Sequence, residues 1–175
     1  MTDSRLKQTT EVLAVGTALF VSFCTLAVYA YQAKVMKEQQ HVSVWPYLEW
    51  ATGNVKDFHI TVKNKGVGPA LIQKVEMTLD GKPVHTATEL VSAVRGPDWS
   101  LQGLINSSLE GRVMSPGEEV SPITITDVTE GRAFEGQLRK HAFQLRITYC
   151  SIYGDCWITE GQRVKRQPKV DLGLY

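Results

Sequence analysis

The sequence predicts an N-terminal transmembrane α-helix followed by an all-β domain of the sandwich class. Residues 12–31 contain no charged side chain, which is typical of a membrane span. Beyond residue 41, about seven short stretches resemble strands and are separated by turn residues. No alternation of strands with long helices accompanies them, so two packed antiparallel sheets are favoured over a parallel α/β fold.

The composition fits one ordinary folded domain with a single membrane segment. The chain has 175 residues, with 19 Lys and Arg against 18 Asp and Glu and a formal net charge of +1. Proteins that bind nucleic acid usually carry a cationic excess, so we expect no nucleic-acid partner. The 3 cysteines are too few for a disulfide-rich mini-scaffold, and the chain is long enough to bury its own core.

The first predicted element is a retained membrane anchor over residues 12–33. A helix over residues 12–31 covers roughly 30 Å, which is the thickness of a hydrocarbon core. A signal peptide would have a shorter apolar region and then a cleavage site, whereas this run continues into a polar, helix-favouring stretch. We therefore expect an N-terminal tail over 1–11 and a helical stalk over 34–41. Three small polar residues inside the span can bond back to main-chain carbonyls: Thr17, Ser22 and Thr25.

The β domain is predicted over residues 42–166, with a C-terminal tail over 167–175. A strand is predicted to begin at Val42. It is a first or edge strand, because Pro46 cannot donate a hydrogen bond to an interior ladder. Residues 90–112 lack a strand pattern and predict a long loop, which either has a function or only crosses between the sheets. A short helix is expected near 98–104 and a helical turn within 131–140. Further strands are predicted over 58–63, 70–79, 82–86, 120–126, 141–149 and 157–165.

Turn chemistry separates the predicted strands. An Asn-x-Gly-x-Gly-Pro corner has two glycines that can take positive φ. An Asp-Gly pair is a strong hairpin signal, and a Pro-Gly pair marks a later turn. The structural turn residues are Asn64, Gly66, Gly68, Pro69, Asp80, Gly81, Pro116 and Gly117.

These turns resemble those of bacterial immunoglobulin-like modules of the CARDB and fibronectin-III-like type. The motifs that carry the resemblance are Asn64–Ala70, Leu79–Gly81 and Ser115–Glu118. Over roughly residues 10–165 the chain is also similar to small bacterial single-pass membrane proteins with such a C-terminal module. The resemblance implies an immunoglobulin-like β-sandwich of about seven strands. It implies no particular activity, because turn signatures specify a fold and not a function.

Cys150 and Cys156 flank the tip of the last predicted hairpin. Directly opposed residues of a hairpin lie close enough for a disulfide, which we favour over two reduced core cysteines or half of a metal site. A zinc site needs four ligands at recognisable spacing, usually with a Cys-x-x-Cys pair, and the sequence has no such pair. The 4 histidines are also dispersed, so we expect no metal site.

The predicted function is non-catalytic. No recognised catalytic or nucleotide-binding motif occurs, so we expect no enzymatic activity, catalytic residue or cofactor. Trp99 lies in the predicted long loop, where an exposed tryptophan would suit partner binding. We expect a membrane-anchored accessory or adaptor subunit of a bacterial envelope or membrane-protein complex. The alternative is an extracytoplasmic ligand-binding domain that signals through the single helix.

Partners and orientation follow from the same features. The expected partners are the lipid bilayer and either another membrane or envelope protein or a second copy of this chain. Lysine and arginine flank the span equally on both sides, so the positive-inside rule gives no preference. A disulfide between Cys150 and Cys156 would form outside the cytoplasm. The sequence therefore predicts a bacterial inner-membrane protein with a cytoplasmic N-terminus and a periplasmic or extracellular β domain.

Overall fold

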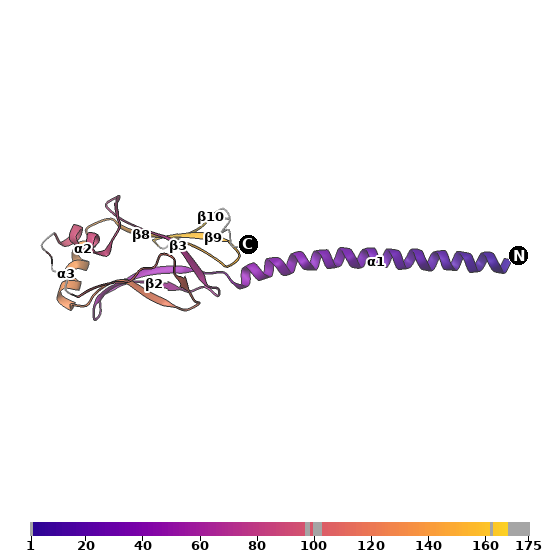
Figure 1. Cartoon of the computed structure of the whole chain (residues 1–175), viewed down its shortest axis with the longest axis horizontal. Coiled ribbons are helices and arrows are strands. Elements are labelled where there is room, and N and C mark those ends of the chain that lie inside the picture. The colour runs from indigo at the N-terminus through magenta and orange to yellow at the C-terminus, as the bar shows by residue number, and fades with distance from the viewer. Residues whose placement is uncertain (1, 97–98, 100–102, 162, 168–175) are drawn as a thin grey trace. The chain divides into compact units, whose positions relative to one another are not determined.

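The computed structural model describes residues 2–96, 99, 103–161 and 163–167, with side chains from residue 11 onward. The chain separates into two compact units, Met1–Val42 and Ser43–Tyr175. The first unit is one long helix and the second holds two packed sheets and two short helices (Figure 1).

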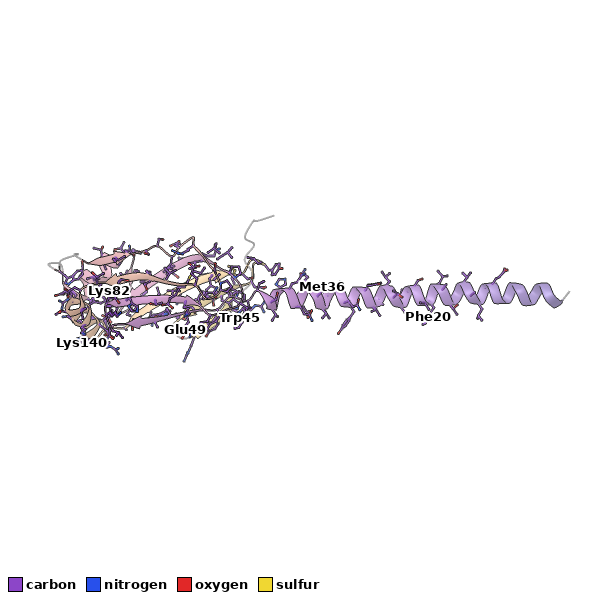
Figure 2. All side chains as sticks on the ribbon, turned by 90° about the horizontal axis from the view of Figure 1, so that it is seen from below. Phe20, Met36, Trp45, Glu49, Lys82 and Lys140 are labelled. Carbon is purple, nitrogen blue, oxygen red and sulfur yellow. A yellow bond between two sulfur atoms is a disulfide. The ribbon has the colours of Figure 1, made fainter. Side chains whose placement is uncertain are left out.

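Helix α1 (Thr2–Ser43) forms the N-terminal unit. Its part Glu11–Ser43 is the one helix of the described residues that is long and apolar enough to cross a membrane. Side chains such as Phe20 and Met36 project outward and are exposed (Figure 2). Small hydroxyl side chains inside the apolar run bond back to main-chain carbonyls: Thr17 to Ala14, Ser22 to Ala18 and Thr25 to Val21.

The helix ends later than predicted, and the first strand begins later. Strand β1 covers Leu48–Gly53, so the predicted strand start at Val42 is wrong. Pro46 explains the difference, because the residue before a proline is disfavoured in the helical region and proline has no N–H to donate. The chain therefore leaves the helix before Pro46 and joins a sheet after it.

Two antiparallel sheets make up the β domain. The four-stranded sheet has the order β1-β2-β7-β5, and the six-stranded sheet has the order β10-β9-β8-β3-β4 with β6 paired to β3. A mostly β domain of two antiparallel sheets is thus confirmed. The strands beyond β1 are β2 (Phe58–Asn64), β3 (Ala70–Leu79), β4 (Lys82–Val84), β5 (Leu104–Asn106), β6 (Val113–Met114), β7 (Glu119–Ile125), β8 (Phe143–Cys150), β9 (Cys156–Glu160) and β10 (Arg163–Gln167).

The described strands number ten and not about seven. The single strand predicted over 157–165 is two strands, β9 and β10, because the chain turns near Gly161 with a φ of 60°. The short strands β5 and β6 lie inside or beside the segment predicted as a loop. Such short strands carry too few residues to show an alternating pattern.

Two capped helices complete the domain. In α2 (Ala87–Arg95) and α3 (Val128–Leu138), the side chains of Thr86 and Asp127 accept the N–H three residues further on. Such N-caps satisfy main-chain donors that have no partner inside the helix. Helix α2 occupies the start of 90–112, so the prediction of one long loop there is wrong.

The other helix predictions have different outcomes. The helical turn expected within 131–140 is part of α3. The short helix expected near 98–104 falls largely outside the described residues, and its last residue, Leu104, begins β5.

The core lies between the two sheets and continues to the helices. Inward-facing side chains of β2 and β8 are buried: Phe58, Ile60, Val62, Leu145, Ile147 and Tyr149. Phe134 of α3 packs edge-to-face on Phe58, with ring centroids 4.9 Å apart. Both helices lie at the same end of the domain (Figure 1), so they cover that end of the core.

Buried polar groups join β1 to the six-stranded sheet. The main-chain N–H of Leu48 donates to the Tyr149 hydroxyl at 3.3 Å, and the Leu48 carbonyl accepts from the Thr159 hydroxyl at 2.8 Å. Burial raises the pKa of Tyr149 to about 12, so the hydroxyl stays protonated over the physiological range. Strand β1 therefore holds the two sheets together and also forms one edge of the four-stranded sheet.

Candidate functional site

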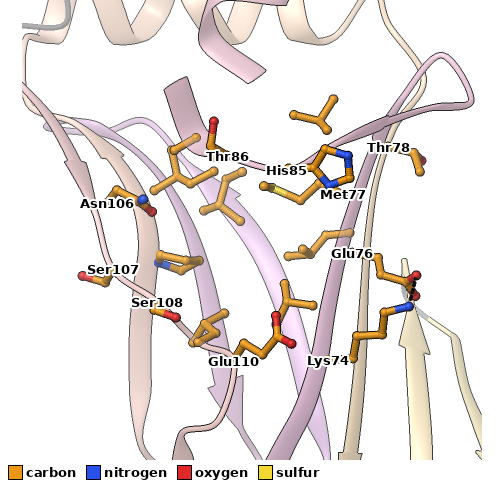
Figure 3. Close-up of a pocket in the computed structure, with 18 of the residues that line it drawn as sticks. Lys74, Glu76, Met77, Thr78, His85, Thr86, Asn106, Ser107, Ser108 and Glu110 are labelled. Carbon is orange, nitrogen blue, oxygen red and sulfur yellow. Dashed lines mark hydrogen bonds and ion pairs between the residues drawn. The ribbon is translucent and has the colours of Figure 1, made fainter. Parts of the chain in front are cut away.

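A groove opens between the two sheets beside β3, β4 and β5 (Figure 3). Its volume is about 500 Å³, which lies within the range of pockets that bind small molecules or side chains. Val75 and Met77 are paired with buried residues of the neighbouring strand β8, so their side chains face the core, yet both are only partly buried. The core is therefore accessible from this side. The apolar walls include Ile60, Val75, Met77, Leu109, Ile123 and Leu145.

A gap along the edge of the six-stranded sheet produces this groove. Strand β6 pairs with β3 at Ala70 and Leu71, and β4 pairs with it from Met77 to Leu79. Among the described residues, no strand pairs with β3 between these two stretches on that side. The four-stranded sheet ends on the same side at the short strand β5, which pairs only with β7. Neither sheet therefore closes the core here.

Polar side chains surround the mouth of the groove. Lys74 and Glu76 form an ion pair of 2.7 Å on one side, and Asn106 and Ser108 stand on the opposite side (Figure 3). Glu110 is exposed at the same mouth and forms no ion pair with any described residue. Because Lys74 balances Glu76, the rim carries one unbalanced negative charge from Glu110.

The arrangement is suited to binding. Apolar walls accept apolar side chains or an apolar molecule, while a polar rim holds the polar parts of a ligand. His85 also lines the mouth and is exposed. No group of three or more His, Cys, Asp or Glu residues that could hold a metal occurs in the described part of the chain.

Trp99 is partly buried against the core, so the expectation of an exposed tryptophan is wrong. Its indole N–H donates to Glu130 Oε2 at 2.8 Å, and Arg95 donates to the same oxygen at 2.6 Å. These two hydrogen bonds hold the pKa of Glu130 below its usual value. Groups from α2 and α3 thus hold the ring in place, and a partner-binding role for Trp99 stays a prediction.

Cys150 and Cys156 form a disulfide. They are directly paired residues of β8 and β9, with Cα atoms 4.0 Å apart. The bond closes a short loop at the tip of this hairpin and holds the two strands in register.

The corner at Asn64–Pro69 is a close contact between main-chain segments. Neither of its glycines takes positive φ, so the reason predicted for them is wrong. A Cβ atom on Gly66 would clash with the carbonyl oxygen of Trp45, and one on Gly68 would clash with that of Val44. Glycine is therefore required because the chain before β1 passes directly over the corner.

The two other turns depend on backbone conformation. Asp80 and Gly81 take φ values of 50° and 78°, which suit the type I′ turn of a two-residue hairpin between β3 and β4. Gly117 follows Pro116 with a φ of 78°, and the N–H of Glu118 donates to the Ser115 carbonyl at 3.0 Å. This second turn has the residue order of type II.

The sequence shows no local sign of the groove. Its lining residues come from six strands and the segments between them. The longer strands show only ordinary alternation, and β4 and β5 are too short to show any pattern. No local pattern marks a place where two neighbouring strands stop pairing. The two helices did carry a signal, because Thr86–Glu89 and Asp127–Glu130 both match the capping pattern with a carboxylate at the third helical position.

Comparison with known families places the whole described architecture in one family. The model of DUF8453, a domain of unknown function, matches residues 8–175. The chain belongs to the DUF8453 family. The match includes the apolar helix as well as the β domain, so DUF8453 combines both parts. No curated protein and no solved structure matches the chain.

Proposed function

We propose that this chain is a membrane-anchored, non-catalytic accessory or adaptor subunit of a bacterial envelope or membrane-protein complex. The observation that carries the proposal is the open groove, where inward-facing apolar residues of β3 are left partly exposed. Exposed apolar surface with a polar rim is typical of protein-binding sites. The partner is another membrane or envelope protein.

Membrane insertion and orientation are part of the same proposal. A helix with exposed apolar side chains over residues 12–31 is stabilised by lipid and destabilised by water. The Cys150–Cys156 disulfide supports a β domain outside the cytoplasm, because disulfides persist in oxidising compartments. The proposed location is the inner membrane, with the N-terminus in the cytoplasm.

We also propose that the sandwich is immunoglobulin-like. Named in chain order as in that fold, β1-β2-β7-β5 correspond to strands A, B, E and D, and β9-β8-β3-β4 correspond to G, F, C and C′. Strand order supports the assignment, while β6 and β10 are additions. The groove then lies between strands C, C′ and D, at the side of the sandwich.

A second candidate function is the binding of a small ligand that is reported through the helix. The volume of about 500 Å³ favours it, since a cavity of that size holds a small molecule. The two candidates differ in what occupies the groove, so one experiment distinguishes them.

The experiment places a photo-crosslinking amino acid at Ser108 on the groove rim of the full chain in native membranes. The matched control is the same amino acid at Val55, which is exposed in the turn between β1 and β2. One membrane protein crosslinked from Ser108 but not from Val55 supports the adaptor. A stoichiometric small molecule in the purified chain, with no crosslink, supports the ligand-binding candidate. If intact membranes give neither a crosslinked protein nor a bound small molecule, both candidate functions are contradicted.

A further inference from the structure

We infer that the groove receives a short extended segment of the partner, which pairs with the main chain of β3 between β6 and β4 and places apolar side chains in the groove. The inference rests on the proposed function, because it names the chemistry of the partner bound at the same site. Added strands of this kind gain affinity from main-chain hydrogen bonds and specificity from side-chain pockets.

The main-chain groups of Val75 face the gap. At the end of β3, the Asp80 N–H donates to the Ala142 carbonyl beside β8. Residues of an antiparallel strand direct their main-chain groups alternately to either neighbour, so Val75 and Met77 direct theirs away from β8. Strand β4 pairs with Met77 and ends there. No described strand pairs with Val75 on this side.

The gap has a definite length. At its other end, the Ile72 N–H donates to the Arg112 carbonyl at 2.9 Å, and the Ile72 carbonyl accepts from the Gly111 N–H at 3.0 Å. The register of β3 against β8 shifts between Ile72 and Lys74, so the regular alternation that runs back from Asp80 stops at Gln73. The regular open edge therefore runs from Lys74 to Glu76, with Val75 at its centre. An extended segment of about four residues, roughly 13 Å long, would cover it.

The side-chain direction agrees with the main-chain direction. Val75 lies opposite buried Ile147 in the sheet register, so its side chain faces the core, as that of Met77 does. A residue paired with Val75 would point its own side chain the same way and cover both. An apolar small molecule would cover these side chains but leave the N–H and C=O of Val75 without a strand partner. Buried main-chain groups are almost always paired, so an extended peptide fits better.

The charge at the rim favours positively charged residues at the ends of the partner segment. Glu110 is the unbalanced carboxylate, Lys74 is paired with Glu76, and the exposed His85 directly follows β4, on the same side of the groove as β3. A lysine or arginine flanking the apolar residues complements this rim. Exposed ion pairs contribute little affinity, so the charge decides orientation and partner choice.

The test measures binding of labelled peptides to the full chain in lipid nanodiscs. The probes are acetylated, amidated peptides Lys-X-Thr-Z-Lys, with every residue type tried at X and Z. We expect the best binders to have valine, isoleucine, leucine or methionine at both positions, with dissociation constants below about 1 mM. Ser108→Trp, which fills the mouth, should abolish binding, while Val55→Trp should leave it unchanged.

N-methylation of the best peptide shows whether the peptide pairs with the main chain of β3 or only fills the groove with its apolar side chains. Only one of X and Z can pair with Val75, because Met77 already pairs with β4 and Gln73 lies at the register shift of β3. The residue opposite Val75 directs its N–H toward β3, whereas the central threonine directs its N–H away. We therefore expect N-methylation of one of X and Z to weaken binding about tenfold or more and N-methylation of threonine to have little effect. Equal effects at X, Z and threonine, or no binder in the whole library, would overturn the inference.

Failure of this inference and failure of the proposed function give different results. A specific crosslink from Ser108 without peptide binding leaves the adaptor function standing and removes the added strand. Peptide binding with the expected N-methylation pattern, but no crosslink in membranes, supports the strand site and contradicts the adaptor.

Discussion

Asn64 shows how a single buried polar residue organises the corner before β3. Its Oδ1 accepts from the main-chain N–H of Gly66 at 3.0 Å and of Tyr47 at 3.2 Å. Its Nδ2 donates to the carbonyls of Gly68 at 2.8 Å and Met114 at 3.1 Å. The side chain thus joins the chain before β1, the corner and β6, and it is fully buried.

We expect Asn64→Ala to lower the free energy of unfolding by about 2–4 kcal/mol, because buried main-chain groups lose their partners. Urea unfolding of the full chain in detergent, followed by tryptophan fluorescence, measures the change. Asn106→Ala at the exposed groove rim is the control and should change stability by less than about 0.5 kcal/mol. A loss for Asn64→Ala no larger than that of the control would show that the corner is held by other contacts.

At the scale of secondary structure, one carboxylate links the two helices and the segment between them. Glu130 lies in the first turn of α3, and Arg95 lies in the last turn of α2. Each charge is favoured at its own helix end by the helix dipole. Their contact, together with the hydrogen bond from Trp99, holds α2 and α3 together at one end of the domain.

This link makes a pH prediction. The hydrogen bonds from Trp99 and Arg95 hold the pKa of Glu130 below its usual 4.5, so its stabilisation is present at neutral pH. It is lost as the pH falls from about the usual value through the lowered pKa of the folded state. Wild type should therefore be more stable than Glu130→Gln near neutral pH, and the difference should shrink in acid.

Urea unfolding of both proteins over a pH series measures that difference. Glu119→Gln is the control, because Glu119 pairs with Lys63 on an exposed face and such pairs contribute little. If the stability difference between wild type and Glu130→Gln does not change with pH, the Glu130 carboxylate does not hold the helices.

At the scale of the whole molecule, an exposed apolar helix is joined to a domain that has its own core. Deleting residues 1–40 should give a soluble, folded β domain, because every residue of the core cluster lies beyond Ser43. The deletion keeps Val44 and Trp45, which contact the glycines of the corner. Circular dichroism and a cooperative thermal transition check this. Aggregation of the fragment, with a well-behaved full chain in detergent, would contradict it.

Topology is the second prediction at this scale. Protease added to spheroplasts should digest the β domain and spare the N-terminal stub. Thiol alkylation before reduction should leave Cys150 and Cys156 unlabelled, since the disulfide forms in an oxidising compartment. Protection of the β domain together with two freely alkylated thiols would reverse the orientation and move the partner to the cytoplasmic face.

The features that could be predicted depend on neighbours in the chain. An uncharged apolar run is visible as such, and so is the alternation of Phe58, Ile60 and Val62 along β2. Asp80 and Gly81 mark their hairpin because the turn needs positive φ at two adjacent residues. The capping patterns of α2 and α3 are also visible in the sequence, although the absence of a strand pattern predicts a loop over residues 90–112.

Tertiary structure alone decided the features that depend on distant segments. Gly66 and Gly68 are required by the main chain of residues 44 and 45, which lies over them, and Trp99 is held by groups on both helices. The groove exists because β4 and β6 pair with the two ends of β3 and leave Val75 between them. The alternation along β3 is the same whether or not its outer edge is covered. Where a neighbouring strand stops is set by the paths of other segments, so the sequence of β3 holds no trace of the groove.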